Sequence, residues 1–189
     1  MARIPSAPDD IPAHADLVAA IRRRRGGRLL NLDRMLLHSP PLAQGWNAHL
    51  GAVREQLTLP PKLRELAICG VAVLNHASYE FDHHAPLYVA AGGTERAARA
   101  LRDFERSIGD ARTYGPDERA VMQLTLEMTR QVQVTDDTLS NVKQQLGDTR
   151  QVVELVGVIA TYNMVSRFLV ALGVDAEPDA AHRPSEAGT

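Results

Sequence analysis

The chain is poor in cysteine, in aromatic residues and in any excess of one charge. Cys69 is its only cysteine among 189 residues, so an intrachain disulfide, a zinc ribbon and a Cys-x-x-Cys redox pair are all excluded. Aromatic residues make up 4% of the sequence, which leaves Leu, Val, Ala and Ile to build the core. The 23 acidic residues nearly balance the 21 basic ones, so the charge gives no reason to expect a nucleic-acid partner.

The sequence also offers no segment that we interpret as a membrane span, and no charged leader precedes an apolar signal core. We therefore expect a cytoplasmic protein without a membrane partner. A hydrophobic content of 44% over this length is enough for one globular domain. Prolines and weak periodicity predict an extended arm over residues 1–12. A helical domain is expected over 13–174 and a flexible tail over 175–189.

Helical periodicity recurs along the chain, and no alternating strand pattern occurs. Proline, Thr and Asp start signals and Gly stop signals divide it into elements. We predict helices over 16–25, 29–38, from 40–41 through 53 and from 61 through the apolar run that ends at 74. A further helical stretch includes 87–91 and ends at Gly92-Gly93, another helix begins at 94–95, and the last three cover 116–132, 135–146 and 149–172. The predicted fold class is all-α, as a single-domain helical bundle.

The last predicted helix, 149–172, is apolar around most of its circumference. A helix that packs against the core of a small domain needs apolar residues on one face only. We therefore expect a homo-oligomer that associates through apolar helices. Asn163 and Arg167 lie four residues apart in this helix. They would either reach a substrate pocket or bridge subunits.

Proton-transferring side chains gather between residues 61 and 95. Leu66 to Leu74 is almost wholly apolar, which predicts a helix at the centre of the bundle. Glu65 begins this run, and Glu80 precedes His83 by three residues and His84 by four, so either imidazole can meet the carboxylate on one helical face. A carboxylate beside an imidazole is a unit of general acid–base catalysis. A solvated surface pair or a structural contact has the same spacing and stays open as the alternative.

These residues resemble a known family. R-E-L-A at 64–67, the apolar run after it and L-N-x-x-x-Y-E-x-x-x-H from Leu74 to His84 are similar to the carboxymuconolactone decarboxylase family, which includes the alkylhydroperoxidase D-like proteins. The stretches L-L-H-S-P-P-L at 36–42 and Y-N-M-V-S-R-F at 162–168 fit as well. The resemblance implies an alkylhydroperoxidase D-like fold and a dimer, trimer or hexamer.

In the peroxidase-type members a glutamate, a Cys-x-x-Cys pair and a histidine form a proton relay. The resemblance places that glutamate at Glu65, the two thiols at Ala77 and Glu80, and the histidine at His84. Because both thiol positions hold other residues, we do not expect disulfide-cycling peroxidase chemistry. Cys69 is interpreted as a buried structural thiol, although its place one turn after Glu65 leaves contact with a pocket open.

We expect Glu65, Glu80 and His84 to be catalytic. His84 would be the general acid/base, Glu80 its orienting partner or a second base, and Glu65 the relay acid. Residues expected to line the substrate pocket are Tyr79, His83, Trp46, His49, Asn163 and Arg167. Arg64 or Arg167 would hold a substrate carboxylate, although no basic residue near the motif is an obvious choice.

Glu80-x-x-His83 has the spacing of one half of a di-iron site, but the second half is missing. A mononuclear site with Glu65 stays open, and our expectation is no metal and no cofactor. Two acids and a histidine favour decarboxylation, lactone opening or isomerisation of a small carbonyl acid without a thiol. The alternatives are a peroxidase-like activity, as the family suggests, and an oligomer that binds a small or apolar ligand without catalysis.

Overall fold

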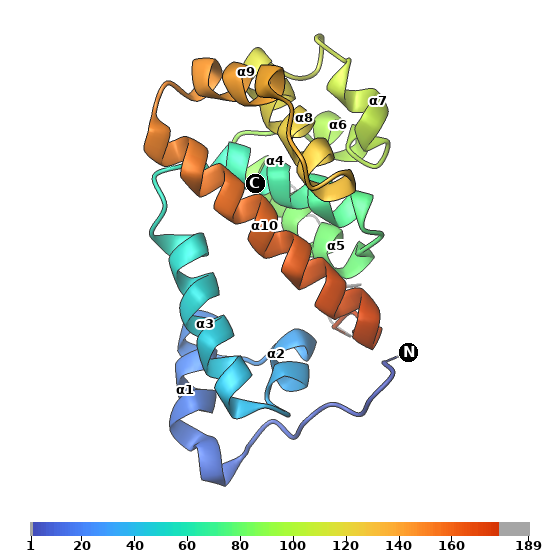
Figure 1. Cartoon of the computed structure of the whole chain (residues 1–189). Coiled ribbons are helices and arrows are strands. Elements are labelled where there is room, and N and C mark those ends of the chain that lie inside the picture. Colours follow the sequence, from blue (N-terminus) through green and yellow to red (C-terminus); the bar gives the residue numbers. More distant parts are fainter. Residues whose placement is uncertain (1, 178–189) are drawn as a thin grey trace, which may run out of the picture. The chain divides into compact units, whose positions relative to one another are not determined.

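The computed structural model describes residues 2–177, and these form two compact units. One unit contains the residues up to Gly51 together with those from Leu172 onward, and the other contains Ala52–Ala171. Ten α-helices and one short 3₁₀ helix occur over the described residues, without a strand, so the predicted all-α class is confirmed (Figure 1). The sequence-based boundaries at residues 12 and 174 differ from this division. Most of the tail expected from residue 175 lies outside the described residues.

The unit that holds the N-terminus contains a 3₁₀ turn (Pro12–His14), α1 (Ala15–Arg24), α2 (Asn31–Leu36) and most of α3 (Pro40–Glu55). The residues before the turn form an arm that is held on α2. Arg34 Nε donates to the carbonyl of Ala7 at 2.8 Å, and a ring nitrogen of His38 lies 2.8 Å from the carbonyl of Pro5. The predicted N-terminal arm is therefore non-helical and anchored by side chains of the same unit.

The second unit is built around α4 (Pro61–Leu74), which packs against α5 (Ser78–Ala90) and α8 (Pro116–Arg130). Pro61 occupies the first turn of α4, where its missing N–H costs no helical hydrogen bond. Leu66 through Val71 have essentially no exposed surface, which confirms the prediction of a central helix. Gly70 allows close packing here, since a Cβ at this position would overlap the ring of Phe104.

Three shorter helices surround this centre: α6 (Glu95–Ala100), α7 (Phe104–Ile108) and α9 (Asp136–Leu146). Thr94 and Thr135 cap α6 and α9 by accepting from the backbone N–H groups of Ala97 and Thr138, as their sequence predicts. The sequence did not predict α7, which has only five residues and no side-chain cap. Burial of Phe104, rather than a local start signal, accounts for this helix.

The longest helix is α10 (Thr149–Leu172), and it is buried on one side only. Its length and mean hydropathy of 1.7 are sufficient to cross a membrane, which corrects our expectation that no segment is long and apolar enough. Half of that apolar window is buried inside the structure. The opposite side exposes Val153, Met164 and Val170.

Candidate functional site

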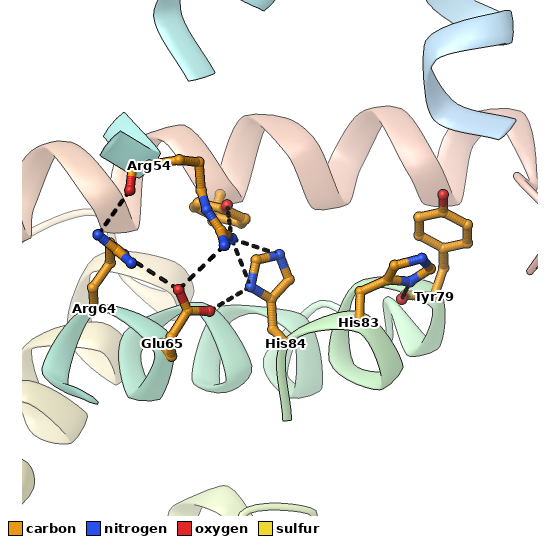
Figure 2. Close-up of polar contacts among 7 residues, drawn as sticks. Arg54, Arg64, Glu65, Tyr79, His83 and His84 are labelled. Carbon is orange, nitrogen blue, oxygen red and sulfur yellow. Dashed lines mark hydrogen bonds and ion pairs between the residues drawn. The ribbon is translucent and has the colours of Figure 1, made fainter. Parts of the chain in front are cut away.

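A buried carboxylate and a buried imidazole meet where α4 packs against α5. Glu65 lies in the second turn of α4 and is 2% exposed, and His84 lies in the second turn of α5 and is 9% exposed. His84 Nδ1 is 2.7 Å from Oε2 of Glu65 (Figure 2). This distance corresponds to a charge-assisted hydrogen bond in which the neutral imidazole donates Nδ1–H to the carboxylate.

Two arginines surround the other oxygen of Glu65. Arg64 Nε lies 3.2 Å and Arg54 Nη2 lies 3.5 Å from Oε1. Arg64 also donates from Nη1 to the backbone carbonyl of Arg54 at 3.0 Å, which fixes the end of α3 beside α4 (Figure 2). The carboxylate therefore has partners on both oxygens, as burial of a charge requires.

Arg54 also contacts His84 and Tyr162. Its Nη1 donates to the hydroxyl of Tyr162 at 3.1 Å, and it lies 3.1 Å and 3.4 Å from Nδ1 and Nε2 of His84. The rings of His84 and Tyr162 meet edge to face with centroids 5.1 Å apart. Because Nδ1–H is directed to Glu65, Nε2 is the nitrogen that carries the lone pair of His84, and Arg54 Nη1 is within hydrogen-bond distance of it.

The protonation states follow from burial and charge. Burial lowers the pKa of His84 to about 4, and the nearby charge of Arg54 acts in the same direction. The hydrogen bond to Glu65 opposes this effect. Burial by itself would raise the pKa of Glu65. The hydrogen bond from His84 and the charges of Arg54 and Arg64 outweigh it and hold that pKa below its usual value. At neutral pH the site therefore contains a neutral imidazole, a carboxylate and two guanidinium groups.

Glu80 does not orient His84, which corrects the role that its spacing suggested. The hydroxyl of Ser166 lies 3.1 Å and 3.0 Å from the two carboxyl oxygens of Glu80, and it also lies 2.8 Å from the backbone carbonyl of Tyr162. Burial raises the pKa of Glu80 well above its usual value, against the effect of the Ser166 hydrogen bond. The one hydroxyl hydrogen of Ser166 cannot serve all three oxygens, and a protonated Glu80 is compatible with these distances, because its O–H can donate to Ser166 while Ser166 donates to the carbonyl.

Tyr79 and His83 form a separate stacked pair at the start of α5. Their ring centroids are 4.4 Å apart, and His83 Nδ1 lies 2.7 Å from the backbone carbonyl of Tyr79. In Figure 2 this pair lies to one side of the cluster formed by Glu65 and His84. A role of these two residues in substrate binding stays a prediction.

Asn163 and Arg167 form polar contacts between helices. Asn163 accepts from Asn75 at 3.0 Å and donates to Thr129 at 3.0 Å, which connects α10 to α4 and α8. Arg167 is exposed and donates to the backbone carbonyl of Asn163 at 2.9 Å. These contacts are typical of a structural role, and their expected function in substrate binding stays untested.

Trp46 and His49 belong to the first unit, on the part of α3 that precedes residue 52. Trp46 is buried, whereas His49 is exposed, so these neighbours in sequence have different environments. Their assignment to a substrate pocket stays a prediction.

The environment of the single thiol does not favour a thiolate. Cys69 is fully buried, and burial together with the charges of Glu65 and Glu80 raises the pKa of its thiol.

Over residues 2–177, no group of three or more His, Cys, Asp or Glu side chains is arranged to hold a metal ion. The mononuclear arrangement of Glu65, Glu80 and His83 is therefore not assembled.

Sequence reasoning missed Arg54, Tyr162 and Ser166 as members of these networks. Tyr162 and Ser166 stand in a stretch that resembles the family, and their spacing of four residues places them on one face of α10. That spacing was the available signal for them. No local sequence pattern marks Arg54. It meets Glu65 because the end of α3 lies beside α4, and spacing along the sequence does not show this.

Solved structures with the same all-helical fold cover nearly the whole chain. The alkylhydroperoxidase AhpD core, an uncharacterized peroxidase-related protein from Ralstonia eutropha, has a TM-score of 0.79 at 14% identity and covers 95% of this chain and 94% of its own. The debrominase Bmp8 bound to 2,3,4-tribromopyrrole has a TM-score of 0.76 at 13% identity, with 96% of each chain covered. A peroxidase-related protein from Silicibacter sp. has a TM-score of 0.75 at 16% identity, with 95% of each covered. At these identities the likeness concerns the fold, which is of the alkylhydroperoxidase D-like class.

The central segment of the sequence is similar to a known family. Residues 40–127 match the model of the carboxymuconolactone decarboxylase family. This segment includes α4 and α5 with Glu65 and His84, so the likeness to that family covers both residues of the candidate site. No curated protein matches the chain at a significant level.

Proposed function

We propose that this protein is an acid–base enzyme that acts on a small carbonyl acid without using a thiol. The observation that supports this proposal is the buried pair of Glu65 and His84, whose free imidazole nitrogen lies beside the guanidinium of Arg54. A stable fold alone would favour apolar packing at such a position, whereas functional sites retain buried charged groups.

His84 is the general base in this proposal. With Nδ1–H donated to Glu65, its Nε2 takes a proton from the carbon next to the substrate carbonyl. The electrons of that C–H bond form the enolate, and its negative oxygen is stabilised by Arg54. Glu65 stabilises the imidazolium that results. When the substrate carries a β,γ double bond, the enolate is conjugated with it, and return of the same proton to the γ carbon moves the double bond to the α,β position. This completes an isomerisation with no added reactant.

The low pKa of His84 discriminates among the reactions that the family suggests. A base that is neutral at rest begins by accepting a proton, as isomerisation and base-assisted lactone opening require. Decarboxylation of a β-keto acid releases CO₂ first and needs a proton donor afterwards. We therefore place isomerisation and lactone opening ahead of decarboxylation.

Arg54 supplies the cation that the sequence did not reveal. The Arg54 side chain is 25% exposed, and its guanidinium contacts Glu65, His84 and Tyr162. The fork of N–H donors suits a carboxylate or an enolate oxygen. This feature supports an acidic carbonyl compound as the substrate.

A peroxidase-like activity is the second reading, since the fold and the family are shared with peroxidase-related proteins. The high pKa and full burial of Cys69 argue against it, because the thiolate is the form that attacks a peroxide. We propose that the protein performs no dithiol cycle. A ligand-binding oligomer without catalysis is the remaining alternative.

The test is a turnover assay over small lactones, β-keto acids and hydroperoxides, with His84→Gln and Cys69→Ser measured beside the wild type. Loss of turnover in His84→Gln with full activity in Cys69→Ser supports the proposal. Turnover of a hydroperoxide that disappears in Cys69→Ser would establish one-cysteine peroxidase chemistry instead. If a lactone or keto acid binds but is not turned over, the result would indicate a ligand-binding oligomer without catalysis.

A further inference from the structure

A second polar cavity lies away from Glu65 and His84, between the end of α7 and the facing sides of α8 and α9. It has a volume of about 380 Å³ and is lined by Ile108, Pro116, Arg119, Gln123, Asn141 and Gln145. Four of these six side chains carry a planar guanidinium or amide group. The size lies within the range of small-molecule sites, which are typically 300–1,000 Å³.

The guanidinium of Arg119 has no anionic partner within residues 2–177. Its Nε atom is buried and makes no hydrogen bond there. The two buried carboxylates of its own helix bind elsewhere: Glu118 accepts from Tyr88 and pairs with Lys62, and Glu127 accepts from Thr135 and Thr138. The guanidinium charge lines the cavity without an anionic partner there, and an anion bound in the cavity would pair with it.

The other side chains of the cavity can bind the rest of a ligand. The three residues of α8 stand at positions 116, 119 and 123, and the two of α9 at 141 and 145, so each set lies on one helical face. Gln145 donates to Asn141 at 3.4 Å, and Gln123 donates to Glu127 at 2.8 Å. These contacts leave the Asn141 amide N–H groups and the side-chain carbonyls of both glutamines for a ligand.

We propose that this cavity binds a small monocarboxylate whose remainder carries hydroxyl or amide groups. The carboxylate would accept from the two Nη atoms of Arg119, in the two-pronged geometry that suits a guanidinium. A single positive charge balances one negative charge, so a monoanion fits better than a phosphate dianion. The site is separate from the proposed chemistry at His84, because none of its lining residues belongs to that network.

Titration calorimetry with N-acetylglycine and lactate tests the site, with acetate and inorganic phosphate for comparison. We expect N-acetylglycine or lactate to bind to the wild type more tightly than acetate and phosphate do. Arg119→Gln and Arg119→Lys should each weaken this binding by about tenfold or more, because both lose the pair of Nη donors of the guanidinium. Arg112→Gln is the matched control, since it removes an exposed arginine outside the cavity.

Asn141→Ala provides a second variant that is safe for folding, because Asn141 is exposed on α9. It should also weaken binding, whereas His84→Gln should leave it unchanged. Absence of binding of all four probes would overturn the proposal. So would binding that is equal in wild type and Arg119→Gln, or a preference for phosphate.

Discussion

His84 Nδ1 lies 2.7 Å from the Oε2 atom of Glu65, although 19 residues separate them in the chain. The bond joins α4 to α5 and fixes which nitrogen of the imidazole holds a proton. A second bond to the same histidine from Glu80, four residues before it on α5, is absent, because Glu80 is bonded to Ser166 of α10. The site is therefore built between helices rather than along one helix.

The first prediction concerns the pH dependence of turnover. The pKa of His84 is about 4 in the folded protein, so the imidazole stays a base well below pH 6.5. We expect kcat/KM for a substrate of the wild type to fall only below about pH 5, with its acid limb near 4. His84→Gln should lower turnover by about 10²- to 10⁴-fold. An acid limb near 6.5 would show that His84 is solvated or is not the base.

The second prediction concerns Arg54, which sequence reasoning missed. Arg54→Gln removes the charge proposed to stabilise the enolate, and turnover should fall by about 10²-fold or more. Arg54→Lys keeps the charge but loses the planar fork, so its loss should be smaller. Arg96→Gln, at an exposed arginine on α6, should change nothing. Equal activity in Arg54→Gln and the wild type would remove Arg54 from the mechanism.

The third prediction concerns stability and Glu80. Its pKa is raised in the folded protein, so the folded state keeps a proton that the unfolded state loses above about pH 4.5. The contribution of Glu80 to stability is therefore fully present below pH 4.5 and is lost as pH rises through the folded pKa. Glu80→Gln keeps a donor for Ser166 and does not titrate.

We therefore expect Glu80→Gln to have a higher free energy of unfolding than the wild type at pH 8. The difference should shrink as the pH approaches 4.5. Urea unfolding at several pH values measures this, with Glu95→Gln as the exposed control. A large loss of stability in Glu80→Gln at pH 8 would mean that Glu80 is ionised and paired.

The fourth prediction concerns the backbone at Val132. This β-branched residue has φ of 67°, in the left-handed region, and its side chain is 82% exposed. Val132→Gly should raise the free energy of unfolding by about 1 kcal/mol, because it relieves the strain without removing a packed side chain. Val134→Gly is the matched control two residues later, where a lower stability is expected. A loss of stability in Val132→Gly would contradict the assigned backbone conformation.

The fifth prediction concerns self-association, which we propose from the exposed side of α10. Exposed residues recur there with alternating spacings of four and three, as in the contact stripe of a coiled-coil helix. They are Val153, Gly157, Ala160, Met164, Arg167 and Ala171. We expect light scattering to find an oligomer at micromolar concentration and Met164→Lys to weaken it. Val132→Lys adds the same charge to an exposed position outside α10 and should leave the assembly intact. A monomeric wild type would exclude this interface.

Much of the fold was predictable from the sequence. Pro61, the apolar run after Glu65, Thr94, Thr135 and Gly147 mark helix starts and ends by local chemistry. The structure places the starts of α4 and α6, and both ends of α9 and α10, within a residue of the predicted positions. Two local errors have local causes. The helix predicted to end at residue 132 ends at Arg130, because Val132 has a left-handed φ. The helix α7 was not predicted, because it lacks a start signal in the sequence.

The sequence by itself determined the helical class, the central place of α4 and the presence of Glu65 and His84 as candidates. Only the tertiary structure decided which groups meet. It paired His84 with Glu65, bonded Glu80 to Ser166 and brought Arg54 beside both Glu65 and Tyr162. The physical reason is that spacing along one helix fixes only which side chains share a face. The partner on another helix, and the burial that sets each pKa, depend on how the helices pack.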